Sequence, residues 1–137
     1  MDYASFKTWF ETLGQAWKNK DPHAAAELFT EDALYHENPF DEPLHGRPAV
    51  FRYWSEETQF QEQISFHSEI LGVTQDTGFA HWWVSFVRIP SKIRVELDGI
   101  CAIRLNDEHK CYALREWWHT REEGVAEDIS DAGRQAL

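Results

Sequence analysis

The sequence predicts a single α+β domain, in which helices gather at one end of a curled, largely antiparallel sheet. Three observations lead to this prediction. Apolar residues recur at helical spacing in the N-terminal part of the chain, whereas apolar and polar residues alternate from Ile64 onward. Three turn signals divide the alternating part into four long strands. A length of 137 residues allows one domain, which we place at residues 1–121.

Three helices are expected before the alternating part. The first covers about residues 3–19, and its aromatic face carries Phe6, Phe10, Leu13 and Trp17. Asp21 supplies an N-cap and Pro22 a first-turn proline for a short helix through residues 23–29. The third helix lies between about residues 46 and 61, and one of its faces is formed by Val50, Phe51, Trp54 and Thr58.

The strands follow from alternation and turn residues. A first strand is expected at Asp32–Asn38, and a loop through Pro39 and Pro43 ends it. The four later strands are separated by turns near residues 75–78, 90–91 and 106–109. Residues 122–137 are polar, and we expect them to form a tail that is flexible or packs on a partner.

The registers of the last two hairpins decide which side chains share a face. A tight turn places Ile89 opposite Lys92, and a four-residue loop places Leu105 opposite Lys110. The concave face then carries Trp82, Val84, Phe86, Val95, Leu97, Gly99, Cys101, Ile103, Leu105, Tyr112, Leu114, Glu116 and Trp118. The same parity places Cys101 and Cys111 on opposite faces, so no disulfide is expected.

Glu116 is the only ionisable carboxylate expected on the concave face. In this register it lies across from Gly99, which leaves open space above the carboxyl group. Desolvation among aromatic side chains raises the pKa of such a group. One interpretation is a functional acid; the other is a structural group bonded to an indole N–H, to Arg47 or to Arg52. The sequence leaves both open.

The convex face carries a different signal. Trp83, Asp98 and Trp117 are expected in one cross-strand row, and two exposed tryptophans together favour a homodimer interface over helix packing.

In the strand of residues 64–75, either His67 and Glu69 or Phe66 and Ile70 point inward. Apolarity favours the second pair.

Composition and spacing exclude several classes of function. With 24 acidic and 13 basic residues the net charge is −11, which argues against nucleic acid or an anionic membrane surface as partner. The N-terminal segment lacks the features of a signal peptide, so a cytoplasmic location with reduced thiols is expected. The seven histidines show no metal-ligand spacing, and no cofactor motif is present, so neither a metal nor a cofactor is expected.

Several short segments resemble the nuclear transport factor 2-like superfamily, and its SnoaL-like and ketosteroid isomerase-like branches in particular. They are WKNKD at residues 17–21, ELFTEDA at 27–33, Pro39, Gly46, Tyr53-Trp54, LDGI at 97–100 and LREWW at 114–118. The resemblance implies a cone-shaped half-barrel, with three N-terminal helices packed on a curved mixed or antiparallel sheet. It also implies a dimer and a small apolar ligand on the concave side.

Carried over position by position, the resemblance implies two catalytic carboxylates. The end of the first strand holds the general base of the isomerase-like members, which is Glu37 here, with Tyr35 also facing inward. The last strand of epoxide hydrolase-like members contributes an acid at the position of Glu116. Leu13 and Cys101 stand where the steroid isomerases have their oxyanion donors, so chemistry of that type is not implied.

Three functional hypotheses follow. The first is a cofactor-independent isomerase, lyase, cyclase or hydrolase acting on a small apolar or aromatic substrate, with Glu37 as base and Glu116 as acid or second base. Its pocket would be lined by Trp17, Tyr35, Trp54, Trp82, Phe86, Cys101 and Trp118. For Glu37 the alternative interpretation is a solvated strand-end residue. The second hypothesis is a non-catalytic binding module with the same aromatic pocket, in which Glu116 recognises a ligand hydroxyl or amine. The third is an interaction subunit that binds another protein through Trp83 and Trp117. Four phenylalanines are assigned to packing: Phe6, Phe10, Phe29 and Phe51.

Overall fold

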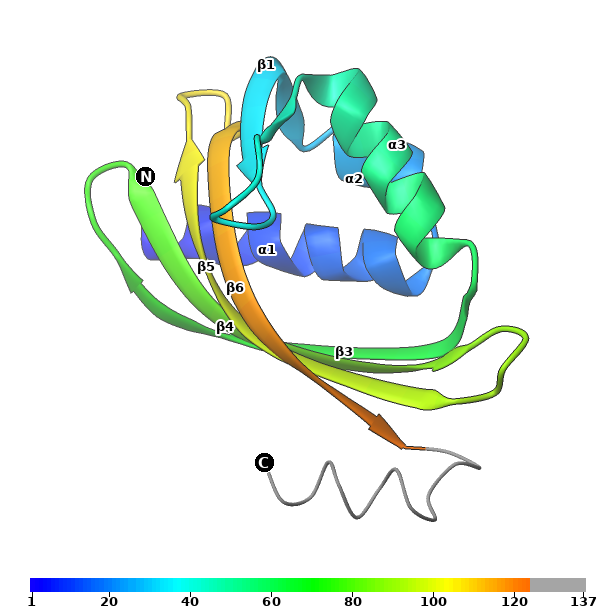
Figure 1. The fold of residues 1–137 in the computed structure, drawn as a ribbon. Helices are drawn as coiled ribbons and strands as arrows, with labels where there is room; N and C mark the ends of the chain where they lie inside the picture. Colours follow the sequence, from blue (N-terminus) through cyan, green and yellow to red (C-terminus); the bar gives the residue numbers. More distant parts are fainter. Residues whose placement is uncertain (124–137) are drawn as a thin grey trace.

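Three helices lie on the concave side of one curved, six-stranded sheet in the computed structural model, which describes residues 1–123 (Figure 1). The helices are α1 (Tyr3–Lys18), α2 (Pro22–Ala26) and α3 (Arg47–Thr58). The strands are β1 (Phe29–His36), β2 (Leu44–His45), β3 (Gln61–Val73), β4 (Thr77–Arg88), β5 (Arg94–Leu105) and β6 (Cys111–Glu123). The sheet order is β2-β1-β6-β5-β4-β3, and β1 pairs with β6 in parallel whereas the other pairs are antiparallel. The predicted α+β class and mixed sheet are confirmed.

Several boundaries differ from the sequence predictions. Helix α2 ends at Ala26 and not at residue 29, β1 spans Phe29–His36 and not residues 32–38, and β3 begins at Gln61 and not at Ile64. The short strand β2 lies just past the expected loop, where its two residues pair with Leu34 and Tyr35 of β1. Strand β6 continues to Glu123, two residues past the expected end of the domain. The rest of the expected tail, residues 124–137, lies outside the described residues. No helix within residues 1–123 is long and apolar enough to cross a membrane.

The helices begin and pack as their sequences indicate, with one exception. The carboxylate of Asp2 caps α1 by accepting a hydrogen bond from the backbone N–H of Ser5 at 2.8 Å. The buried face of α3 is formed by Val50, Trp54 and Thr58. Phe51 does not belong to it, because its side chain is 41% exposed, so its assignment to packing was wrong.

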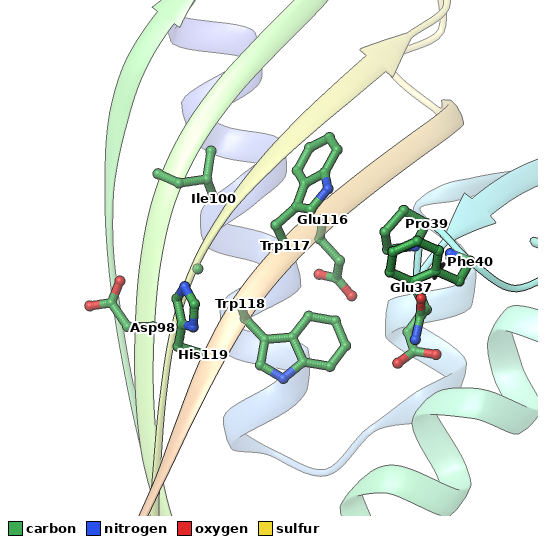
Figure 2. A pocket seen from close by; sticks show the side chains of 11 residues that line it. Glu37, Pro39, Phe40, Asp98, Ile100, Glu116, Trp117, Trp118 and His119 are labelled. Carbon is green, nitrogen blue, oxygen red and sulfur yellow. Dashed lines mark hydrogen bonds between the residues drawn. The ribbon is translucent and has the colours of Figure 1, made fainter. Parts of the chain in front are cut away.

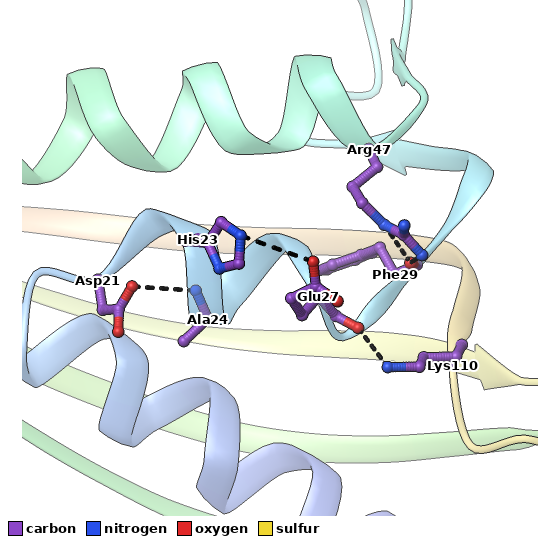
Figure 3. A network of polar contacts seen from close by, with 7 residues as sticks. All are labelled: Asp21, His23, Ala24, Glu27, Phe29, Arg47 and Lys110. Carbon is purple, nitrogen blue, oxygen red and sulfur yellow. Dashed lines mark hydrogen bonds and ion pairs between the residues drawn. The ribbon is translucent and has the colours of Figure 1, made fainter.

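A polar network fixes the start of β1 between α3 and the β5–β6 turn (Figure 3). The guanidinium of Arg47 donates from Nε and Nη2 to the carbonyl oxygen of Phe29, at 3.0 and 2.7 Å. Lys110 Nζ donates to the carbonyl oxygen of Glu27 at 2.6 Å. These charge-assisted bonds hold the segment that leads into β1, and they set how far β1 runs alongside β6.

The registers confirm the predicted faces but shift one pairing. Strands β4 and β5 pair as expected, with Trp82 opposite Gly99. Between β5 and β6 the register is displaced by two residues, so Glu116 lies opposite Cys101, and Trp118 takes the position opposite Gly99. The displacement arises in two steps: at the turn Leu105 pairs with Cys111 and not with Lys110, and Tyr112 then has no pairing partner on β5. A displacement of two leaves the inward and outward parity of Glu116 unchanged.

The irregularity at Tyr112 also reverses the faces expected for Cys111 and Tyr112. Cys111 is fully buried in the core, whereas Tyr112 turns outward and donates to the carboxylate of Asp76 at 3.1 Å. The expectation that Cys101 and Cys111 lie on opposite faces was therefore wrong. Both are buried, and within the described part of the chain both are free thiols.

The same displacement of two residues changes the predicted pairing on the convex face. Trp83 pairs with Asp98, but Asp98 pairs with His119, and Trp117 pairs with Ile100. The predicted row of Trp83, Asp98 and Trp117 was therefore wrong by two residues. In β3 the favoured choice is confirmed, because Phe66 and Ile70 pack against the core. His67 lies on the convex face, with its ring stacked on that of Trp83 at 5.7 Å.

Two strand glycines give a matched test of how tightly the sheet packs. A Cβ at Gly78 would lie 2.5 Å from the buried ring of Phe6, whereas a Cβ at Gly72 would have no atom within 4 Å. Gly78→Ala should therefore lose about 1–3 kcal/mol of unfolding free energy. Gly72→Ala should keep the wild-type value or gain up to about 1 kcal/mol. Urea unfolding measures both, and a Gly78→Ala protein as stable as the wild type would show that Phe6 is not packed this way.

Candidate active site around Glu116

Two adjoining hollows meet at Glu116: an inner cavity on the concave side of the sheet, and a cleft lined by residues from both faces of β5 and β6. The inner cavity, of about 190 Å³, lies between α1, α3 and the sheet, and its lining includes Trp17, Tyr53, Trp54, Glu57, Gln61, Trp82, Arg88, Glu116 and Trp118. The mouth cleft, of about 450 Å³, lies beneath the segment that follows β1, and its lining includes Glu37, Asn38, Pro39, Phe40, Gly99, Ile100, Glu116, Trp117 and Trp118. Glu116 and Trp118 line both, so they stand where the two hollows meet.

Glu116 is half-buried, and its carboxyl group lies where the two hollows meet. Its Oε1 accepts a hydrogen bond from the hydroxyl of Tyr35 at 3.0 Å. Burial raises the pKa of Glu116 to about 8, against the lowering effect of the Tyr35 bond and with help from the charges of Glu37 and Glu57. The group is therefore predominantly protonated at neutral pH and can donate a proton.

The neighbouring Tyr35 is held by packing on both sides. It lies on β1 directly across from Leu114 of β6, and its ring contacts those of Phe29 and Tyr53 at centroid distances of 5.6 and 5.3 Å. Burial and the charge of Glu116 raise the pKa of Tyr35 well above its usual value. The phenol consequently stays neutral and serves as a fixed hydrogen-bond donor to Glu116.

Glu37 approaches the same space from the other wall. It follows β1, is half-buried, and lines the mouth cleft opposite Glu116. Figure 2 shows both carboxyl groups directed toward the space beside the indole of Trp118. Burial and the charge of Asp41 raise the pKa of Glu37 above its usual value. Two carboxyl groups in different environments thus flank one cleft, an arrangement suited to paired acid and base steps.

Indole rings form most of the wall of the inner cavity. Trp17 meets Trp54 edge to face at 5.1 Å and Trp82 at 5.8 Å. The N–H of Trp17 donates to Oε1 of Gln61 at 2.9 Å. The N–H of Trp54 is buried and has no hydrogen-bond partner among the residues that the structure describes. A buried donor without a partner is uncommon in folded proteins, so a ligand acceptor would improve the packing here.

The predicted site residues divide into two groups. Trp17, Trp54, Trp82 and Trp118 line the inner cavity with Glu116, and Tyr35 lies behind Glu116 as its hydrogen-bond donor. Phe86 and Cys101 line neither hollow, since both are buried in the packing. The alternative partners proposed for Glu116 are occupied elsewhere or turned away: Arg47 bonds to Phe29, and Arg52 is exposed.

Several lining residues were not predicted from the sequence, among them Tyr53, Glu57, Gln61 and Arg88. Tyr53 and Glu57 lie one helical turn apart on α3, and that spacing relative to Trp54 could have identified them. Gln61 is a buried polar residue at the start of β3, and no pattern in the sequence distinguishes it from a surface glutamine. Within residues 1–123, no group of three or more His, Cys, Asp and Glu side chains is arranged to hold a metal ion.

Replacing Glu116 by Gln should change how stability depends on pH. The ordinary pKa of its carboxyl is 4.5, whereas in the folded protein the pKa is about 8. The folded state holds the proton more tightly, so the wild type loses stability as pH rises through this interval, by up to about 1.4 kcal/mol per pH unit. The Gln variant lacks that loss. Its stability relative to wild type should rise with pH across the interval and level off above it, as urea unfolding at several pH values would measure.

A Tyr35→Phe protein is the matched comparison. Loss of the phenol donor should raise the pKa of Glu116 further and extend the interval to higher pH. A stability difference between the Glu116→Gln protein and the wild type that is the same at every pH would contradict a buried, titrating Glu116.

Comparison with known proteins agrees with this architecture. The chain matches the SnoaL-like domain family over residues 8–112, and no curated protein matches it. Its fold is similar to that of SalBIII, an epoxide hydrolase/cyclase-like enzyme with a role in pyran ring formation in polyether salinomycin, with a TM-score of 0.75 and 18% identity over 86% of this chain and 93% of that one. It is also similar to the delta 5-3-ketosteroid isomerase from Mycobacterium sp., with a TM-score of 0.73 and 12% identity over 86% of this chain and 98% of that one. A computationally designed 17-OHP binder gives a TM-score of 0.73 and 16% identity over 85% of this chain and 96% of that one.

At these identities the structural likeness establishes the fold alone, whereas the family match covers most of the sequence. The chain therefore belongs to the SnoaL-like domain family of the nuclear transport factor 2-like superfamily.

Proposed function

We propose that the protein is a cofactor-independent acid–base enzyme, of the isomerase, cyclase, lyase or hydrolase type, that acts on a small molecule held beside Glu116. The observation that carries this proposal is the Glu116 carboxyl itself, which lies at the junction of the inner cavity and the mouth cleft and is held by Tyr35. Its pKa of about 8 supplies a proton donor at neutral pH.

The two carboxyl groups would act in turn. Glu37 removes a proton from the substrate, while Glu116 gives its proton to a substrate oxygen, as in enolisation of a ketone or opening of an epoxide. Glu116 becomes a carboxylate as its proton leaves, and the Tyr35 hydroxyl stabilises that charge by the bond it already donates. Return of the proton from Glu37, directly or through water, completes the cycle without a cofactor.

Several features support the proposal. The rings of Trp17, Trp54, Trp82 and Trp118 give the substrate an apolar wall against Glu116. The structural neighbours include a ketosteroid isomerase and an epoxide hydrolase/cyclase-like enzyme. Leu13 is buried in the core, and Cys101 lies behind Glu116 as its strand partner. Neither residue provides the oxyanion donors of the steroid isomerases, so we assign oxygen protonation to Glu116.

Conservative exchange of the carboxyl groups tests the proposal. Glu116→Gln and Glu37→Gln should each lower kcat by about 10²–10⁴-fold, because each removes a general acid or base but keeps the shape of the side chain. A panel of small unsaturated ketones and epoxy alcohols, followed by NMR for turnover and by tryptophan fluorescence for binding, provides the readout. A wild-type protein that binds these compounds without converting any of them, and whose variants lose affinity only, would favour a binding module. The unpartnered N–H of Trp54 is the observation that suits that second function.

We further propose that the convex face of the sheet forms a homodimer. Trp117 and its strand partner Ile100 are 46% and 40% exposed, and Trp83 lies on the same face. Apolar side chains gathered on one surface favour association. Trp117→Arg should convert a dimer to a monomer in sedimentation velocity, whereas Phe60→Arg, at an equally exposed site beside α3, should not. A wild-type protein that sediments as a monomer at high concentration would contradict the dimer.

A further inference from the structure

Among the described residues that line the inner cavity, Glu57 is a carboxylate without a counter-charge, whereas Glu116 is a neutral carboxyl group at pH 7. Glu116 lies at its inner end, and Glu57 of α3 stands at its exposed rim. Arg88 is the one cation among the described residues that line the cavity, and it is paired with Glu122 at 3.1 Å. Neither Glu57 nor Glu116 forms an ion pair within residues 1–123. The unpaired carboxylate of Glu57 at the end of an apolar cavity favours a cationic ligand over a neutral one of the same shape.

The aromatic wall has the geometry to receive such a charge. The rings of Trp17 and Trp54 meet at 72°, and those of Trp17 and Trp82 at 57°, so they enclose the cavity from different directions and do not stack flat. Trp118 and Tyr53 complete the enclosure. A cation held among tryptophan faces is attracted by the ring quadrupoles, and the attraction is greatest where water is excluded.

An independent feature of the same wall indicates that a ligand belongs here. Trp54 is 5% exposed and lines the inner cavity, and its N–H has no partner in the described part of the chain. The missing acceptor cannot be supplied by an ammonium group, which only donates. A ligand that pairs with both the Glu57 carboxylate and the Trp54 N–H therefore carries a positive charge and a hydrogen-bond acceptor.

We propose that the inner cavity recognises the ammonium group of a small organic amine that also bears an oxygen acceptor, and that Glu57 is the residue that selects for the charge. This inference deepens the proposed function by naming the substrate class of the same site. Glu57 pairs with the ammonium group at the rim, the indoles surround the carbon atoms next to the charge, and the acceptor faces Trp54. Glu116 stays free to act on the reacting atoms at the junction with the mouth cleft.

The position of Glu57 separates recognition from catalysis. It lies on α3, whereas Glu37 and Glu116 belong to the segment after β1 and to β6. It lines the inner cavity and does not line the mouth cleft, where the two proposed catalytic carboxyl groups face each other. Glu57 can therefore pair with the charge of a bound amine while Glu116 and Glu37 stay free for the acid and base steps.

A pair of isosteric probes tests the proposal directly. Phenyltrimethylammonium and tert-butylbenzene have the same shape and differ in charge. The wild type should bind the cation at least about tenfold more tightly, as measured by quenching of tryptophan fluorescence and by calorimetry. The probe keeps its charge at every pH, so a change in affinity reports on the protein alone.

Two neighbouring glutamates on α3 provide the matched variants. Glu57→Gln should lower the affinity for phenyltrimethylammonium about five- to tenfold and leave that for tert-butylbenzene unchanged. Glu56→Gln is the control, because Glu56 is exposed one residue away and does not line the cavity. It should keep the wild-type preference. Both substitutions lie on the exposed side of a helix, so each variant is expected to fold.

Three results would overturn the inference. They are equal or tighter binding of tert-butylbenzene, binding of neither probe, and a preference for the cation that survives in Glu57→Gln. Failure here is distinguishable from failure of the acid–base proposal. The exchange of Glu37 and Glu116 is read by turnover of uncharged ketones and epoxides, and its outcome does not depend on the charge of the ligand.

Discussion

The parallel pairing of β1 with β6 is the constraint on which the candidate site depends. It joins the first strand of the chain to the last, with Tyr35 opposite Leu114 and His36 opposite Arg115. Because β1 ends there, the following segment leaves the sheet just where Glu116 begins its exposed stretch of β6. Tyr35 can then donate to Glu116, and Glu37 can face it across the mouth cleft. Arg47 and Lys110 hold the entry to β1 by donating to the backbone carbonyls of Phe29 and Glu27, so the pairing is anchored away from the site.

This constraint explains how a carboxyl group is kept protonated in a protein of net charge −11. Tyr35 offers Glu116 a neutral hydrogen-bond donor. Among the described residues that line the inner cavity, the one cation is Arg88, and it is already paired with Glu122. Aromatic rings occupy the remaining space around the group. Low polarity and nearby negative charge both favour the neutral acid, and the single phenol bond moderates the effect without reversing it. The same lack of positive charge is what makes a cationic ligand a fitting occupant of the neighbouring cavity.

Alternation and helical spacing were sufficient to predict the fold class and the face to which Glu116 belongs. The period of a strand is two, so polarity reports which face a residue occupies but cannot distinguish registers that differ by two residues. That is why Glu116 was expected opposite Gly99 and lies opposite Cys101. The irregularity at Tyr112 has no signature in hydrophobic pattern, and it alone reversed Cys111. Helical spacing identified Trp17 and Trp54, whereas Glu57 resembles any solvated acid on α3 until the cavity beside it is known.

The central claim is that Glu116 is a neutral carboxyl group at physiological pH. Carbon-13 NMR of protein labelled at the glutamate carboxyl carbons measures this directly, with the Glu116→Gln protein used to assign the resonance. We expect a Glu116 signal that has the chemical shift of a protonated acid at pH 7 and titrates with a pKa of about 8. A Glu116 signal that titrates at the ordinary value of 4.5 would contradict it.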